Sequence, residues 1–320
     1  MRRSIVLAAL VLSATAVLAS EDVIRKGFNV SDGGTLRLNG AVGRIRVVTG
    51  GTGVAVEITR TAHGRRAEKK LQEHRITFDQ RGNDVVIESD LDNDRSFWGN
   101  WDDDYEVQWN IRVPDHYNVD VSTSGGSIEI DEIQGVVEAR TSGGSIKTGR
   151  ITGEGNLKTS GGSIAVSGVT TRLLAHTSGG SITVGDSTGP VEVKTSGGSI
   201  KLARIQGDVL ARTSGGGIRI DDATGTVDAS TSGGSIHATL SAQPRGDSRL
   251  STSGGNVVVS LAPSVAVELD ARASGGGVSS DVPVTVQGTQ DDDAIHGRIN
   301  GGGPRLVLRT SGGGIRVKPL

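Results

Sequence analysis

The sequence contains no cysteine among its 320 residues. This absence excludes disulfide bonds, thiol catalysis, thiolate metal sites and a lipid anchor on cysteine. Aromatic residues make up only 2% of the chain, and the net charge is −2. The scarcity of aromatic side chains argues against a wide globular core, and the near balance of charge does not favour nucleic acid or a membrane surface. We therefore expect no nucleic-acid partner and no cofactor.

Only the first residues of the chain combine positive charge with a sustained apolar run. Arg2 and Arg3 precede the apolar segment 5–12, and a cleavage position follows at Ala19. This pattern is typical of a secretory signal peptide, here residues 1–19. An uncleaved anchor helix is the alternative, although the apolar run is short for a bilayer span. We expect export to the periplasm, the cell surface or the medium, without a transmembrane segment in the mature chain.

Glycine is abundant, with 49 residues, and much of it lies in one repeated hexapeptide. Thr-Ser-Gly-Gly-Ser-Ile, with glycine at its fifth position in one copy, recurs seven times at a spacing of 18 residues. Looser copies follow at spacings of 21, 21 and 37. A constant period indicates a stack of similar units, each contacting mainly its neighbours. The regular copies begin at Thr123, Thr141, Thr159, Thr177, Thr195, Thr213 and Thr231, and the looser ones at Thr252, Ala273 and Thr310.

Each repeat, numbered as columns 1 to 18 from its first Thr, alternates apolar and polar positions. Column 6 is isoleucine in all seven regular copies, and columns 8, 15 and 17 favour apolar or small residues. This period of two indicates strands with one buried face, and parity also places the column-1 Thr inward. We predict an all-β fold, a single-stranded parallel β-helix (β-solenoid) of 18-residue coils over residues 121–320. Chain order places Ile315 in the last coil, where we expect the stack to fray.

Residues 20–120 lack the repeat. Short alternating apolar segments separated by glycine turns predict several strands, and residues 105–113 predict a long, half-buried strand. The charged segment 65–75 has Ala67 and Leu71 at helical spacing, which predicts one short surface helix. Because an end coil of a solenoid exposes unpaired strand edges, we predict that residues 20–120 form a β-rich cap.

Several motifs together resemble the bacterial "putative adhesin" domain family of unknown function. They are GRIRV at 43–47, WNIRVP at 109–114, the hexapeptide array, GRINGGGP at 297–304 and LVLRTSGG at 306–313. The resemblance covers nearly the whole mature chain. It implies a right-handed parallel β-helix at the cell surface or in the envelope. It implies no established activity and no catalytic residues.

Column 18, which parity places outward, is mostly basic. At a coil spacing of about 4.8 Å its residues would form a ladder of four permanent cations and one histidine. Such a ladder suits a regularly spaced anionic polymer, such as an acidic polysaccharide or lipopolysaccharide phosphates. Column 7 adds Lys147, Lys201 and Arg219. The ladder consists of Arg140, Lys158, His176, Lys194 and Arg212.

A simpler interpretation of the ladder is also open. The cations would then only keep the β-surface soluble, and Glu138, Glu192 and Asp228 of column 16 on the same face would offset them. Three aromatic residues, Phe97, Trp98 and Trp101, form a second candidate site as a contact patch for sugar rings or a protein partner. The alternative for these three is a small satellite core on the cap.

Catalysis by clustered carboxylates, as in many β-helical polysaccharide lyases and hydrolases, has weak support. The pairs 131–132 and 221–222 belong to coils five apart, so about 24 Å would separate them. The six histidines have no metal-ligand spacing, and the serines lack a fixed histidine partner. Acidic loops at 92–104 and 291–293 lack the ordered spacing of a calcium site, so we interpret them as solvated loops. We predict no catalytic residues and no metal site.

These observations favour a non-catalytic exported module, an adhesin or cell-envelope scaffold that presents a repetitive surface. An anionic glycan or an envelope protein is the partner that this surface suits. The first alternative is a carbohydrate-active enzyme of the polysaccharide lyase or hydrolase type. The second is a purely structural envelope protein without a ligand. No sequence feature specifies an oligomeric state.

Overall fold

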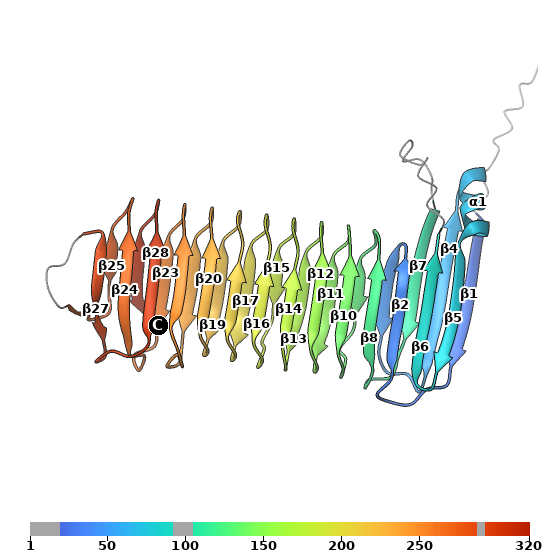
Figure 1. Ribbon diagram of the computed structural model, residues 1–320, viewed down its shortest axis with the longest axis horizontal. Coiled ribbons are helices and arrows are strands. Elements are labelled where there is room, and N and C mark those ends of the chain that lie inside the picture. The colour runs from blue at the N-terminus through green and yellow to red at the C-terminus, as the bar shows by residue number, and fades with distance from the viewer. Residues whose placement is uncertain (1–19, 92–104, 287–291) are drawn as a thin grey trace, which may run out of the picture.

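The computed structural model describes residues 20–91, 105–286 and 292–320 of the chain. The chain forms an elongated stack of coils with a short helix at the N-terminal end (Figure 1). Its strands form two long sheets, one of 14 and one of 15 strands. The predicted all-β solenoid is confirmed. The predicted signal peptide, residues 1–19, lies outside the described residues.

Each repeat supplies one strand to each sheet, as predicted. We call the 14-stranded sheet the Ile sheet, because it carries column 6, and the 15-stranded sheet the Thr sheet, because its strands lead into column 1. The central Ile-sheet strands are β9 (Ile128–Ile130), β11 (Ile146–Ile151), β13 (Ile164–Val169), β15 (Ile182–Val184), β17 (Ile200–Ile205), β19 (Ile218–Ala223), β21 (Ile236–Leu240) and β23 (Val257–Leu261). The central Thr-sheet strands are β8 (Asn118–Thr123), β10 (Val137–Thr141), β12 (Gly155–Thr159), β14 (Leu173–His176), β16 (Val191–Lys194), β18 (Val209–Arg212), β20 (Val227–Thr231) and β22 (Ser248–Thr252).

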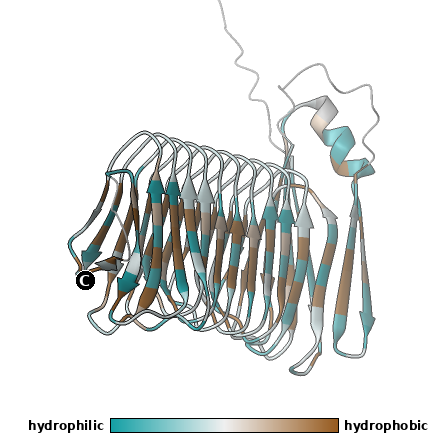
Figure 2. Cartoon of the chain, turned by 60° about the vertical axis from the view of Figure 1, so that its left-hand side comes forward, coloured by the Kyte–Doolittle hydropathy of each residue, from teal (hydrophilic) through white to brown (hydrophobic). Residues whose placement is uncertain are grey.

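The core is a single continuous column of apolar side chains between the two sheets. Parallel pairing keeps each repeat column in register, so Ile164 of column 6 lies between Ile146 and Ile182. Figure 2 shows the resulting alternation of apolar and polar residues along the strands. All of the columns predicted to point inward are buried. Column 11 is also buried, through Ile133, Ile151, Val169 and Ile205, and was not predicted to be part of the core.

The hexapeptide needs glycine in its turn because the backbone there packs directly on the backbone of the preceding coil. A Cβ atom at Gly162 in column 4 would lie 2.2 Å from the carbonyl oxygen of Gly144, so only glycine fits. The column-1 hydroxyl links the same two coils. Thr159 Oγ1 donates a hydrogen bond to the Gly144 carbonyl at 2.7 Å and accepts one from the Gly162 N–H at 3.4 Å. These two hydrogen bonds explain why column 1, although buried, is Thr rather than Val.

At the C-terminal end the coils do not stack in chain order. Strand β28 (Arg305–Thr310) lies between β22 and β24 (Val267–Ala273), and β29 (Ile315–Pro319) lies between β23 and β25 (Val278–Ser280). The expectation that Ile315 belongs to the outermost coil is therefore wrong. The antiparallel strands β27 (Ala294–Ile299) and β26 (Thr285–Val286) cover the outer edge of the Thr sheet.

At the N-terminal end, too, the coils do not stack in chain order. Strands β2 (Thr35–Ala41) and β3 (Arg44–Val48) pair in parallel with the first repeat, and β6 (Asp84–Asp90) and β7 (Tyr105–Arg112) pair in parallel outside them. The outermost strands β1 (Ser20–Phe28), β4 (Val54–Ala62) and β5 (Arg75–Arg81) run antiparallel to their neighbours. The predicted short helix is α1 (Arg65–Glu73), and the predicted long strand is β7.

Candidate functional site

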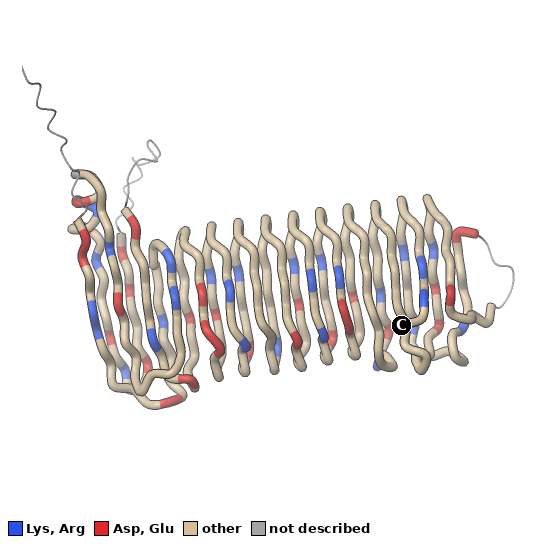
Figure 3. Tube along the Cα trace, turned by 180° about the vertical axis from the view of Figure 1, so that it is seen from behind, with Lys and Arg blue, Asp and Glu red and all other residues tan. Residues whose placement is uncertain are grey.

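Column 18 forms an unbroken row on the outer face of the Thr sheet. Parallel pairing places Arg140 beside Lys158, then His176, Lys194 and Arg212 on successive strands from β10 to β18. The regular period that keeps the core in register thus also brings these five residues together. Figure 3 shows that basic and acidic residues are mixed along the stack rather than segregated.

The row extends beyond the residues that the repeat period identifies. Ser230 follows Arg212, then Ser251, Arg309 and Arg272 on strands β20, β22, β28 and β24. Arg309 lies before Arg272 in space because the last coil of the chain is inserted between two earlier ones. Sequence reasoning missed these two arginines because it followed column 18 only through the regular 18-residue copies.

Carboxylates pair with three of the four permanent cations of the ladder. Lys194 Nζ lies 2.5 Å from Glu192 Oε1, and Arg212 Nη2 lies 3.1 Å from Asp228 Oδ2. Arg140 pairs with Glu138 and lies 3.8 Å from Asp120. The partners predicted in column 16 therefore do offset these charges. Each pair is at least partly exposed to solvent, where such pairs contribute about 0–1 kcal/mol.

Lys158 is the exception in the ladder. Its ammonium group forms no ion pair or hydrogen bond within the described part of the chain. The column-16 residue of its own coil is Asn156, whose amide donates a hydrogen bond at 3.2 Å to Glu138. A neutral residue thus replaces the acid that Arg140 and Lys194 have two positions before them.

His176 lies at the centre of the row, between Lys158 and Lys194. Burial lowers its pKa, the positive charges of Lys194 and Lys158 lower it further, and Glu192 opposes them. The imidazole is therefore mainly neutral at pH 7. Its Nε2 atom lies 3.9 Å from Glu192 Oε1, whose own pKa is lowered chiefly by the hydrogen bond from Lys194.

Column 7 lies on a different side of the molecule. Lys147, Lys201 and Arg219 belong to β11, β17 and β19 of the Ile sheet, whereas column 18 belongs to the Thr sheet. These three cations therefore do not extend the column-18 row. Two of them have acidic neighbours, since Lys147 lies 3.6 Å from Glu129 and Arg219 lies 2.6 Å from Asp221.

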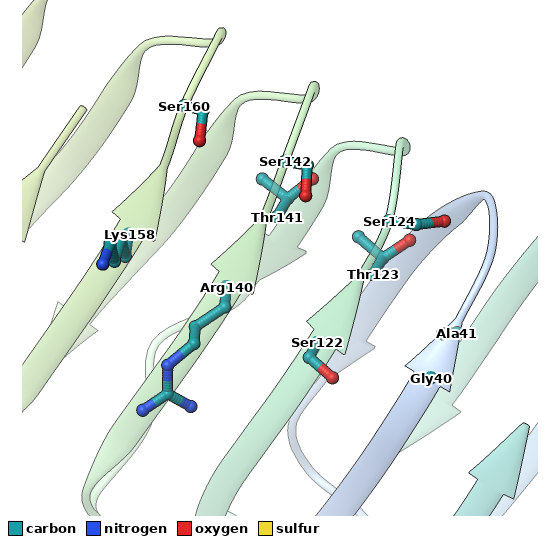
Figure 4. A pocket seen from close by; sticks show the side chains of 10 residues that line it. All are labelled: Gly40, Ala41, Ser122, Thr123, Ser124, Arg140, Thr141, Ser142, Lys158 and Ser160. Carbon is teal, nitrogen blue, oxygen red and sulfur yellow. The ribbon is translucent and has the colours of Figure 1, made fainter. Parts of the chain in front are cut away.

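A groove of about 360 Å³ lies at the N-terminal end of the row. It forms where the pairing of β2 with β8 shifts between Leu38 and Ala41. Gly40 lies in this irregularity with φ 70°, and a Cβ atom there would lie 2.3 Å from the Ser89 carbonyl oxygen. Figure 4 shows the lining residues, which are Gly40, Ala41, Ser122, Thr123, Ser124, Arg140, Thr141, Ser142, Lys158 and Ser160.

A buried polar cluster fixes α1 to the sheets at the same end of the molecule. His74 Nδ1 lies 2.7 Å from the Tyr105 hydroxyl and Nε2 lies 2.8 Å from Ser89 Oγ. Arg60 pairs with Asp22 and donates to the Leu71 and His74 carbonyl oxygens, each at 3.1 Å. Burial, followed by the Arg60 charge, lowers the pKa of His74 to about 4, against the opposing charge of Asp90. Sequence reasoning did not identify this cluster because its members come from separate strands.

The remaining candidates divide into two groups. The aromatic patch, Phe97, Trp98 and Trp101, and the acidic loop 92–104 lie outside the described residues. Strands β11, β13, β15 and β17 separate β9, which precedes residues 131–132, from β19, which contains residues 221–222. Within the described ranges, no three His, Asp or Glu side chains are grouped to hold a metal ion, and no helix is long and apolar enough to cross a membrane.

Comparisons with known proteins identify a family. A family model described as Toastrack DUF4097 matches residues 44–318, and no curated protein matches the chain. Similar solved structures include a "putative cell adhesion protein" from Clostridium sporogenes ATCC 15579, 11% identical, with 95% of this chain and 100% of the other covered and a TM-score of 0.24. Another is a "putative adhesin" from Bacteroides fragilis NCTC 9343, with 11% identity, coverage of 94% and 98%, and a TM-score of 0.31. A "putative lipid binding protein" from Parabacteroides distasonis ATCC 8503 has 13% identity, coverage of 93% and 97%, and a TM-score of 0.30. TM-scores this low carry no argument about the present chain.

Proposed function

This chain belongs to the Toastrack DUF4097 family, a family of unknown function, and we propose that it is an exported, non-catalytic module that binds an anionic polymer. The observation that carries the proposal is the column-18 row, in register on five successive strands of the Thr sheet. Parallel strands repeat at about 4.8 Å, so the row presents its charges at a fixed interval. An acidic glycan of the cell envelope has the repeating charge that such a row suits.

The ion pairs along the row do not block this role. Exposed pairs such as Lys194 with Glu192 contribute little to stability, so a carboxylate or sulfate of the polymer can replace the protein's own carboxylate at low cost. Lys158 needs no such exchange, because it has no partner within the described residues. We therefore expect binding that is weak per contact, additive along the row and strongly dependent on salt.

The test is binding of heparin across a salt series, for the native protein and for Lys158→Glu/Lys194→Glu. The matched control is Lys147→Glu/Lys201→Glu on the Ile sheet, which changes the net charge equally. It too combines a lysine that has an acidic partner with one that has no ion pair in the described part of the chain. The proposal predicts that the first variant loses at least roughly tenfold in affinity at low salt and that the control loses much less. Equal losses, or no binding by the native protein, would contradict it.

A structural envelope component without a ligand is the second candidate. The pairing of Arg140, Lys194 and Arg212 with carboxylates favours it, since those cations then serve the solubility of the sheet. The heparin series also tests this candidate, which predicts no binding at any salt concentration. We propose no catalytic role, because four strands of the Ile sheet separate the two carboxylate pairs.

Export is the remaining part of the proposal. Its support is the sequence, in which Arg2 and Arg3 precede the apolar segment 5–12 and a cleavage position follows at Ala19. We expect the mature protein to begin at Ser20 and to appear in periplasmic or external fractions. Mass spectrometry of the isolated protein measures the first, and cell fractionation the second.

A further inference from the structure

The groove at the N-terminal end of the column-18 row differs from the rest of the row in shape. Elsewhere the row lies on a regular sheet face, but here a concave space lies beside the irregular pairing of β2 with β8. Its volume, about 360 Å³, is at the lower end of the range of small-molecule sites. In Figure 4 the side chains of Arg140 and Lys158 lie on one side of this space, and hydroxyl groups lie along its upper edge.

The groove also contains hydrogen-bonding groups that no other described group uses. The hydroxyls of Ser124, Ser142 and Ser160, column 2 of three successive repeats, make no side-chain hydrogen bond within the described residues. Lys158 has no carboxylate partner there either, whereas Arg140 already pairs with Glu138. The site therefore offers one uncompensated positive charge beside three hydroxyls that can both donate and accept.

These groups define the chemistry of a ligand. One free ammonium group matches one negative charge, and a row of hydroxyls matches a polyol. The lining contains no aromatic side chain on which a neutral sugar ring could stack. Building on the proposed function, we propose that the groove binds a single acidic pyranose, with its anionic group on Lys158 and its ring hydroxyls on Ser124, Ser142 and Ser160. The anionic group is a carboxylate or a sulfate, and it anchors one unit of a polymer that then follows the row.

The first experiment measures binding of D-glucuronate, glucose 6-sulfate and D-glucose from the shifts of groove amide signals in NMR spectra. We expect the two anionic sugars to shift the amides of residues 122–124, 140–142 and 158–160, and D-glucose to bind at least roughly tenfold more weakly. Whichever of the two anions binds more tightly identifies the preferred group. Equal binding of D-glucose, or shifts spread evenly along the row, would overturn the proposal.

Two pairs of variants locate the site. Lys158→Gln should weaken glucuronate binding at least roughly tenfold, whereas Lys194→Gln, in the same column two coils away, should leave it unchanged. Ser142→Tyr should fill the groove and abolish binding, whereas Ser196→Tyr, in the same column outside the groove, should not. All four positions have exposed or half-buried side chains, so the variants are expected to fold. Equal effects within either pair would overturn the assignment.

The same variants separate this inference from the polymer function. If glucuronate binds in the groove but heparin does not bind the chain, the groove assignment stands and the polymer function fails. If heparin binding depends equally on Lys158 and Lys194, and glucuronate produces no shifts, the row is the site and the groove assignment is wrong.

Discussion

The central repeats and the two ends of the solenoid are built by different rules. From β8 to β22 every coil stacks on the one that precedes it in the sequence, and the register shifts only where β19 pairs with β21. At the N-terminal end β6 and β7 lie outside β2 and β3, and at the C-terminal end β24 and β25 lie outside β28 and β29. In the centre, sequence neighbours are spatial neighbours. At the ends, segments far apart in the sequence complete the stack.

The order of the end coils shows how the two ends of the stack are covered. A further parallel coil would leave strand edges that could pair with another chain. At each end the connection between the inner and the outer coil contains antiparallel strands that cover the outer coil, namely β27 at one end and β4 and β5 at the other. Antiparallel covering strands therefore occur only where chain order and coil order differ. We propose that residues 20–120 act as a cap in this sense.

The largest expected effect tests whether the N-terminal coil packs like a repeat. A Cβ atom at Gly126 would lie 1.8 Å from the Gly43 carbonyl oxygen, whereas one at Gly125 would have no neighbour within 4 Å. Gly126→Ala should therefore destabilise the protein by more than about 4 kcal/mol, because the backbone must move, and Gly125→Ala by less than about 1 kcal/mol. Urea denaturation measures both. Similar costs at the two adjacent positions would show that β3 does not support the first repeat.

The next effect compares a central coil with the inserted one. Ile182 is fully buried between Ile164 and Ile200, and Ile315, 2% exposed, lies between Val257 and Val278. Each change to alanine should cost about 2–5 kcal/mol, as large-to-small changes in cores do. The two costs should agree within about 1 kcal/mol, since both side chains have coils on either side. A much smaller cost at Ile315 would mean that the C-terminal coil frays and that chain order does decide the stacking.

A smaller effect distinguishes the N-terminal end by its pH dependence. His74 has a pKa of about 4 in the folded protein against 6.5 when unperturbed, so the unfolded chain binds more protons between these values. Stability is therefore fully present above pH 6.5 and falls as the pH is lowered towards 4, by roughly 1–2 kcal/mol from this group once the full shift is discounted for solvent screening. Hydrogen exchange of β6 and β7 amides at several pH values measures the loss. In His74→Gln the stability of the same region should no longer fall in this pH range. A pH dependence equal to that of the native protein would exclude His74 as its source.

The last pair of effects, of similar size, comes from the same substitution at two buried threonines of the central coils. Thr195 Oγ1 bonds to Gly180 and Gly198, at 2.7 and 3.3 Å, whereas the buried Oγ1 of Thr148 in column 8 has no hydrogen-bond partner. Thr195→Val should cost about 1–3 kcal/mol, because it leaves buried backbone groups unpaired. Thr148→Val should stabilise by about 1 kcal/mol, because it removes a buried hydroxyl that is itself unpaired. Changes of the same sign would contradict the assigned role of column 1.

The candidate site was only partly predictable. The column-18 row followed from the period and from parity, because strands of equal spacing must align equal columns. Two features depended on side-chain placement, namely the ion pairs of Arg140, Lys194 and Arg212 and the lack of a partner for Lys158 within the described residues. The order of Arg309 and Arg272 in the row depended on the order of the end coils. The groove lies beside the irregular pairing of β2 with β8, which no repeat in the sequence predicts.

The sequence by itself determined the central coils, since a period of 18 residues with alternating apolar columns leaves one parallel register that buries every apolar face. It also determined the structure of the turn, because the glycines and threonines there contact the equivalent turn of the adjacent coil. Only the tertiary structure decided the order of the end coils, the covering antiparallel strands and the groove beside β2. Those features arise from pairing between segments far apart in the chain, where no period links one partner to the other and competing arrangements differ by packing alone.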